Sequence, residues 1–254
     1  MTSWESHGLV LGGRRYGEGG LILDVLTEQM GRRSGFVYGG ASRRKRGQLQ
    51  TGNTLELSWS ARSETQLGKF DIAEATSERA GEHMDDASAL AAISAITGLL
   101  RDGLEEGDTV GSALYEPTTV LLDLLDEPEI WPALYVRWEL GVLAALGFGL
   151  DLSRCAVSGS NDGLTHVSPR TGRAVKGSEA EDYIDRLYKL PSFLIDPTAP
   201  VTPDTLGQGF VLTGHFIERR IYAAINKPPP EERDLLLARL ERSGTIAFVD
   251  EETG

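Results

Sequence analysis

The spacing of apolar residues changes near residue 80, and this change limits the folds that the chain can adopt. Before it, apolar and polar residues alternate, most clearly in TLELSW, where Leu55, Leu57 and Trp59 share one face of a predicted strand. After it, apolar residues recur at helical spacing, as in ASALAAISAITGLL (87–100). We therefore expect an α+β protein, with a β-rich domain over residues 1–80 and a mostly α-helical domain over 81–254.

The first 80 residues contain five short apolar runs of strand length: GLVLGG, LILDVLT, RRSGFVYGG, TLELSW and KFDIAEAT. Because no helical period interrupts them, they predict a five-stranded barrel of the oligonucleotide-binding (OB) type. In the second part, Ser178 and Glu181 have the spacing of a capping box and predict a helix there. Thr202 and Pro203 begin another helix. The Ser-, Gly- and Pro-containing segment 153–177 predicts a small two-stranded flap.

Positive charge gathers in the N-terminal part of a chain whose formal net charge is −13. Residues 1–80 hold 11 Lys and Arg against 9 Asp and Glu, whereas the remainder holds 14 against 29. The cations form three clusters, Arg14–Arg15, Arg32–Arg33 and the run Arg43, Arg44, Lys45 and Arg46. A solvated loop would also explain one such run. Three clusters in loops or strand ends of one barrel favour phosphate contacts. Salt screens charges over about 8 Å, so a polyanion that touches the barrel interacts mainly with these nearby cations and little with the acidic remainder of the chain.

The aromatic residues of the predicted barrel are candidates for stacking on nucleobases. Trp59 shares its face with Leu55 and Leu57, so we expect it in the core. Phe36 and Tyr38 share a face of their own strand, and the sequence leaves open whether that face is buried.

Several classes of function find no support in the sequence. Four scattered histidines form no metalloprotease motif, and GRAVKGS lacks the lysine of a phosphate-binding loop. No nucleophile, base and orienting group come together, so we expect no catalysis. The single cysteine, Cys155, indicates a reducing compartment and a packed thiol. With no signal peptide and no apolar run long enough to span a membrane, we expect a cytoplasmic protein that does not interact with membranes.

Four segments occur in a fixed order along the chain: GLVLGGRRYGEGGLILDVLTEQMGRRSGFVYGGASRRKRG, WELGVLAALGFGLDLSRCAVSG, VSPRTGRAV and LTGHFIERRI. In these segments and their order, the chain resembles the RecO family of bacterial recombination mediators over nearly its whole length. The resemblance implies binding of single- and double-stranded DNA, annealing of complementary strands, and loading of RecA onto DNA coated by single-strand binding protein (SSB), in association with the nucleoid. It implies RecR and the acidic SSB tail as partners, with RecA acting indirectly and RecF a further candidate.

For the SSB tail, the resemblance points to Arg137 in the central helix, and Arg219 and Arg220 are further candidates. A cation in an acidic helical domain also pairs readily with Asp or Glu, so ion pairing is the competing interpretation. Many family members bind zinc through two C-x-x-C pairs. Here the first pair reads Cys155-Ala156-Val157-Ser158 and the second is absent, so we expect no metal and no cofactor.

Three other functions remain open at this point. An OB-fold factor for structured RNA would prefer RNA to single-stranded DNA. A small-substrate enzyme would need a deep pocket with converging polar groups in the helical part. A non-catalytic protein scaffold would bind an acidic peptide through the basic run and ignore oligonucleotides.

Overall fold

The computed structural model describes residues 2–63 and 65–248, whose contacts form two compact units. The first unit extends to Asp126 and includes Pro230–Leu236, and the second comprises Glu127–Pro229 and the residues from Leu237 onward. The helix α7 (Glu231–Arg242) therefore contributes to both units. Helices that follow the barrel belong to its compact unit, so a domain boundary near residue 80 stays a prediction.

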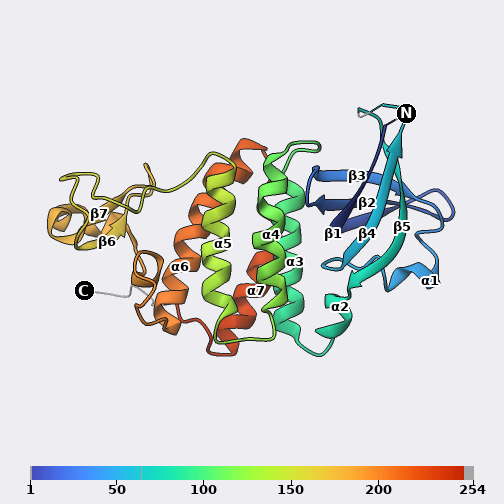
Figure 1. The fold of residues 1–254 in the computed structure, drawn as a ribbon. Coiled ribbons are helices and arrows are strands. Elements are labelled where there is room, and N and C mark those ends of the chain that lie inside the picture. The colour runs from blue at the N-terminus through green and yellow to red at the C-terminus, as the bar shows by residue number, and fades with distance from the viewer. Residues whose placement is uncertain (1, 64, 249–254) are drawn as a thin grey trace. The chain divides into compact units, whose positions relative to one another are not determined.

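Five strands of the first unit close into a barrel (Figure 1). They are β1 (Thr2–Tyr16), β2 (Gly20–Thr27), β3 (Gly31–Val37), β4 (Thr54–Ala61) and β5 (Gly68–Ser77). Their order is β1-β2-β3-β5-β4, with β3 and β5 parallel and the other neighbours antiparallel. This arrangement confirms the α+β class and the OB-type barrel expected from the sequence.

The barrel core follows the alternation in the sequence. Leu55, Leu57 and Trp59 are buried, and Glu56 between them is exposed. Trp59 is therefore a core residue, as its apolar neighbours predict, and its indole Nε1 donates to the Ser34 carbonyl at 3.3 Å.

Two long helices of the first unit, α3 (Ala87–Gly103) and α4 (Val110–Asp123), pack against the barrel. The Asp86 carboxylate caps α3 by accepting from the backbone of Ser88 and Ala89. The approach of α4 to β3 is close. A side chain at Gly31 would lie 2.0 Å from the Asp108 carbonyl oxygen, and Gly31 also has a positive φ of 64°, so only glycine fits there. The short helix α2 (Arg79–Glu82) connects β5 to α3.

The second unit is built on α5 (Trp131–Ala145) and α6 (Pro203–Phe216), which lie side by side (Figure 1). Thr202 caps α6 and Pro203 begins it, as the sequence predicts, and Thr202 also forms a capping box with Thr205. Ile217–Tyr222 continues α6 as a π-helical segment, which sequence periodicity did not reveal. Between α5 and α6, the Thr213 hydroxyl donates to the carboxylate of Glu139, which is fully buried.

The flap contains three strands instead of the expected two: β6 (Leu164–Val167), β7 (Ala174–Lys176) and β8 (Tyr188–Lys189). The helix predicted from Ser178 and Glu181 is wrong. Gly177–Glu179 and Glu181–Arg186 form 3₁₀ turns, because hydrogen bonds join residues three apart and Tyr183 departs from helical geometry at φ −144°. A further 3₁₀ turn covers Ser192–Leu194.

None of the helices in the described part of the chain is both long and apolar enough to cross a membrane.

Candidate nucleic-acid interface

The basic run forms one turn of helix, α1 (Arg43–Arg46), instead of the expected irregular loop. Arg43, Arg44 and Arg46 are exposed. Their guanidiniums make no hydrogen bond or ion pair with any described residue, so they are available to an anion. Lys45 is half-buried, and its ammonium donates to the Tyr38 carbonyl at 3.0 Å.

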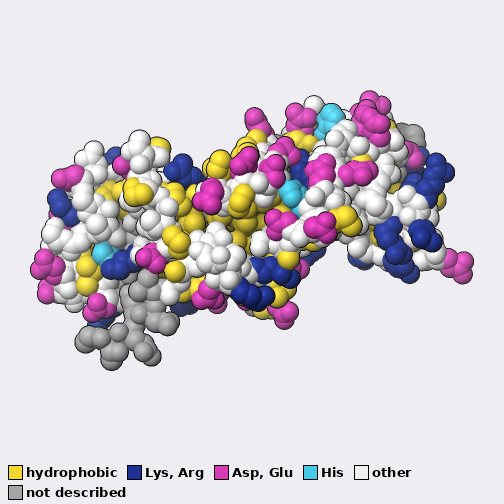
Figure 2. Space-filling view, turned by 90° about the horizontal axis from the view of Figure 1, so that it is seen from below, with side chains coloured by type: hydrophobic (Ala, Val, Ile, Leu, Met, Phe, Trp, Pro, Cys, Tyr) yellow, Lys and Arg dark blue, Asp and Glu magenta, His cyan; other side chains and the backbone are white. Residues whose placement is uncertain are grey.

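The packing of the β3–β4 connection fixes the position of α1. Leu49 is buried in the barrel core, and its backbone N–H donates to the Lys45 carbonyl at 3.0 Å. The Asn53 amide donates to the carbonyls of Gly47 at 2.9 Å and Gln48 at 3.2 Å. A short, highly charged helix would be unstable by itself, so these contacts are what hold it. Figure 2 shows Lys and Arg side chains gathered at the end of the barrel that carries α1.

The structure brings Arg14 and Arg15 to this same end of the barrel. Both are exposed in the last residues of β1. Strand register places Arg14 opposite Ile22, which in turn lies opposite Phe36 of β3. The backbone of Ala41, just before α1, donates to the Gly19 carbonyl in the β1–β2 turn at 3.4 Å. Two of the three predicted basic clusters therefore lie at one end of the barrel.

Three aromatic rings lie among these cations. Tyr16 and Tyr38 are exposed by 59% and 68%, and the Phe36 ring lies between them. Its centroid is 6.0 Å from that of Tyr16 and 4.6 Å from that of Tyr38, with both pairs edge to face. The face shared by Phe36 and Tyr38, which the sequence left undecided, is therefore the outer one. We call Tyr16, Phe36 and Tyr38 the aromatic cluster.

Lys69 adds a cation that the sequence analysis did not single out. It pairs with Phe36 across the parallel strands β3 and β5. Its ammonium binds the Asp71 carboxylate at 2.8 Å, and the pKa of Lys69 is raised first by that hydrogen bond and then by the Asp71 charge. Strand register was the only signal that could have found it, because Lys69 lies more than 20 residues beyond the basic run.

Arg32 and Arg33 do not join the other cations. They lie at the start of β3, at the opposite end of that strand from Phe36. Arg32 donates to the Asp24 carboxylate at 3.3 Å and to the Leu104 carbonyl at 3.2 Å. The guanidinium of Arg33 lies beside Gly107, in the connection between α3 and α4. A role for Arg32 and Arg33 in binding nucleic acid stays a prediction, and the contacts of Arg32 with Asp24 and Leu104 give that residue a structural role.

In the second unit, the predicted partner-binding arginines separate into two places. Arg137 of α5 donates to the Phe193 carbonyl and places its guanidinium 5.9 Å from the centroid of the Phe193 ring. Arg219 and Arg220 lie on the π-helical segment, where they line a cavity of about 460 Å³ together with Arg170, which the sequence analysis missed. We call the cavity lined by Arg170, Arg219 and Arg220 the cationic pocket.

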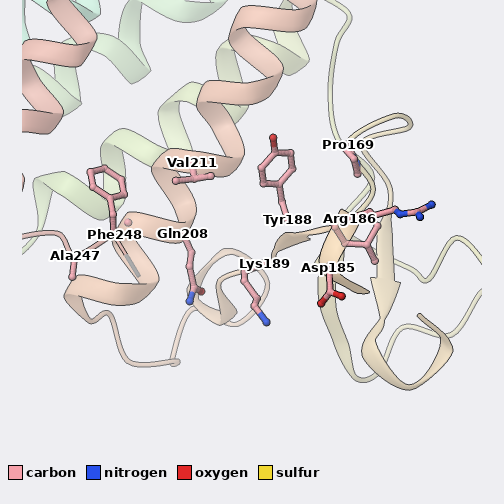
Figure 3. Close-up of a pocket in the computed structure, with 11 residues that line it drawn as sticks. Pro169, Asp185, Arg186, Tyr188, Lys189, Gln208, Val211, Ala247 and Phe248 are labelled. Carbon is pink, nitrogen blue, oxygen red and sulfur yellow. The ribbon is translucent and has the colours of Figure 1, made fainter. Parts of the chain in front are cut away.

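A second cavity, of about 520 Å³, shares Pro169 with the cationic pocket. Val211 and Gln208 of α6 lie across it from Tyr188 and Lys189 of β8 (Figure 3). We call this cavity the apolar pocket, because Leu187, Tyr188, Val211, Ala247 and Phe248 also line it. Three charged side chains, those of Asp185, Arg186 and Lys189, line it as well.

The environment of Cys155 does not fit a zinc ion. The thiol is buried, donates to the Glu179 carboxylate at 3.0 Å, and accepts from the backbone of Val157 and Lys176. Hydrogen bonds from Cys155 and then Ser158 hold the pKa of Glu179 below its usual value. With one thiolate donor and the Lys176 side chain nearby, the site lacks the ligands of a structural zinc. Among the described residues, no cluster of three or more metal-ligating side chains occurs.

Comparisons with known proteins match both parts of the chain. The family model for the N-terminal part of recombination protein O covers residues 1–79, and the model for its C-terminal part covers residues 84–229. The DNA repair protein RecO of Hyphomonas neptunium is 66% identical over 238 residues, or 94% of this chain and 98% of the relative. Those of Methylorubrum extorquens and Rhodospirillum rubrum are 45% and 40% identical, and each match covers more than 90% of both chains.

Proposed function

Because the chain belongs to the RecO family, we propose that it is a DNA repair protein that binds single- and double-stranded DNA through the barrel. The observation that carries this proposal is α1, whose three exposed arginines lie at the same end of an OB-type barrel as Arg14 and Arg15. Each cation that neutralises a phosphate releases counterions from DNA, which favours binding whatever the sequence.

The proposed activity is annealing of complementary strands and loading of RecA onto SSB-coated DNA, as a mediator without catalysis of its own. Annealing requires two polyanions to approach one another, and neutralising their charge is the main physical requirement. A surface of exposed guanidiniums meets that requirement without a nucleophile or a metal ion. The proposed partners are RecR, SSB and, indirectly, RecA, with RecF a further candidate. Work on chromosomal DNA would place the protein at the nucleoid in the cytoplasm.

The test compares two triple variants with the same change in charge. In the first, Arg43, Arg44 and Arg46 become serine. In the control, three exposed arginines of the second unit, Arg154, Arg186 and Arg242, become serine. Fluorescence anisotropy of a labelled single strand gives the affinity of each protein. Three lost phosphate contacts should weaken binding about 100-fold at 0.1 M salt, whereas the control should bind like the wild type.

Each outcome separates the proposal from its competitors. Equal binding by both variants would move the phosphate site away from α1. A wild type that ignores DNA but binds an acidic peptide would favour a protein scaffold. Stronger competition by structured RNA than by single-stranded DNA would favour an RNA-binding factor.

For the partner SSB, the two pockets of the second unit suit a tail that is acidic and ends in phenylalanine. The cationic pocket offers charge to the acidic residues, and the apolar pocket offers a surface for the aromatic ring. Arg219→Ser with Arg220→Ser should weaken the binding of a labelled tail peptide at least tenfold. Arg137→Ser, tested separately, reports on the second candidate position. If neither variant changes peptide affinity, the tail binds elsewhere.

A further inference from the structure

Resting on the proposed function, we propose that the aromatic cluster of Tyr16, Phe36 and Tyr38 is a stacking surface for unpaired nucleobases. Through it, the barrel distinguishes single-stranded from duplex DNA. The cationic residues around it have no such selectivity, because both kinds of DNA carry phosphates.

The two tyrosine rings of the cluster are open to solvent. Tyr16 and Tyr38 are among the most exposed large side chains of the described chain. No hydrogen bond to a described residue occupies either phenolic hydroxyl. Both rings meet Phe36 edge to face, with interplanar angles of 79° and 86°, so Phe36 contacts them without covering them face to face.

The central ring of the cluster, Phe36, is held in place before any ligand arrives. Phe36 lies over Gly20, where a side-chain Cβ would come within 2.2 Å of the ring. Gly20 is opposite Tyr16 at the start of β2, so a single glycine makes room for the central ring beside its neighbour. A ring already fixed by packing loses little freedom when a base stacks on it, which favours binding.

The cations lie where the phosphates of a stacked strand would have to pass. The Lys45 ammonium donates to the Tyr38 carbonyl at 3.0 Å, which ties α1 directly to the cluster. Arg14 shares the outer face of the sheet with Phe36, and Lys69 is the neighbour of Phe36 on the other side. A single strand can therefore place phosphates on cations and bases on rings together. In a duplex the bases are already stacked and paired, so only the phosphate contacts remain.

The experiment measures affinity for a short unstructured single strand and for the duplex of the same sequence. The variant is Tyr16→Leu with Tyr38→Leu, and the control is Tyr183→Leu, which changes an exposed tyrosine of the second unit. We expect the double variant to bind the single strand at least tenfold more weakly and the duplex within twofold of the wild type. Tyr16→Phe with Tyr38→Phe should restore binding, because stacking needs the ring and not the hydroxyl.

A fluorescent base analogue reports on stacking directly, and so distinguishes a loss of stacking from a general loss of affinity. Emission from 2-aminopurine in the strand should change on binding wild type and the phenylalanine variant, but not the leucine variant. Equal losses for single strand and duplex, or unchanged affinity for both, would overturn the stacking surface while leaving the phosphate site intact. Failure of the wild type to bind either DNA would instead overturn the proposed function. Unchanged thermal unfolding of the variants verifies that they are folded.

Discussion

Arg79 shows how one buried arginine can join several segments of the first unit. Its side chain is 5% exposed and binds the Asp123 carboxylate of α4 at 2.6 Å. It also donates to the Gly52 carbonyl at 3.1 Å and to the Thr54 hydroxyl at 2.8 Å. Replacing it with an apolar side chain leaves two buried acceptors without a donor.

We predict that Arg79→Met lowers the free energy of unfolding by about 2–3 kcal/mol. The loss stays below that of a fully buried pair because the Asp123 side chain is 59% exposed and returns to water. Urea denaturation measures the change. The control Arg62→Met, at an exposed position, should stay within about 0.5 kcal/mol of the wild type. If Arg79→Met also changes the free energy of unfolding by only about 0.5 kcal/mol, the hydrogen bonds of Arg79 contribute little to stability.

For single residues, the sequence showed which clusters are basic, but it did not show which arginines are free and which are paired. Arg32 and Arg43 are equally basic, and both lie in clusters on the predicted barrel. They differ because Asp24 and the Leu104 carbonyl lie within reach of Arg32, whereas α1 holds Arg43 in solvent. Those partners come from segments distant in sequence. A single sequence does not indicate such pairs, so the free cations had to be found in the structure.

Among the elements, the flap contains a buried histidine whose surroundings disfavour the charged form. His166 of β6 is 5% exposed, and its Nδ1 lies 2.9 Å from the Thr165 hydroxyl. Burial, and secondly the charge of Lys189, lower the pKa of His166 below its usual 6.5. In the unfolded chain that pKa returns to 6.5, so around and below this pH the unfolded chain binds the proton more tightly than the folded chain does.

We predict that the flap loses stability as the pH falls from about 6.5 towards 5. Substitution of His166 by glutamine, which does not titrate in this range, should remove most of this dependence. Hydrogen exchange of the β6 and β7 amides, followed at several pH values, measures it within the flap. Parallel pH dependence in both proteins would assign the effect to another group.

The flap is also the part of the chain whose secondary structure the sequence patterns predicted least well. Ser178 and Glu181 have the spacing of a capping box, but the backbone around Ala180 forms 3₁₀ turns and Ala180 itself is fully buried. Strand β8 has only two residues and pairs with β6 from more than 20 residues away. Such a short strand has no period of its own, so alternation could not predict it.

For the whole molecule, the distribution of charge matters more than its sum. The net charge of −13 would suggest that the chain avoids DNA. Five exposed arginines nevertheless lie at one end of the barrel: Arg14, Arg15, Arg43, Arg44 and Arg46. Since screening acts over about 8 Å, a strand in contact with them experiences mainly their field.

We predict that raising the salt from about 50 to about 200 mM weakens binding of a single strand roughly 100-fold, at a slope of about 0.7 per contact for five contacts. An anisotropy series at constant pH measures the slope. A slope of about one or less in the plot of log affinity against log salt concentration would mean that most of these arginines do not contact phosphates.

The barrel and the helices α3 and α6 were predictable from the sequence, because burial on one face imposes a regular period and a capping residue marks a helix start. Leu55, Leu57 and Trp59 are an example of period two, and the apolar stripe of α3 is an example of helical period. The aromatic cluster was predictable only in part. Phe36 and Tyr38 share a face by alternation, but Tyr16 joins them through strand register, which depends on the turn between β1 and β2.

The way α1 is attached has a consequence for how this protein can change over evolution. Leu49 and Asn53 hold the β3–β4 connection, and the three exposed arginines of α1 contribute nothing to the barrel core. Substitutions at these three positions can therefore accumulate without unfolding the chain. Affinity for a polyanion can rise or fall in small steps while selection for a stable barrel acts on other residues.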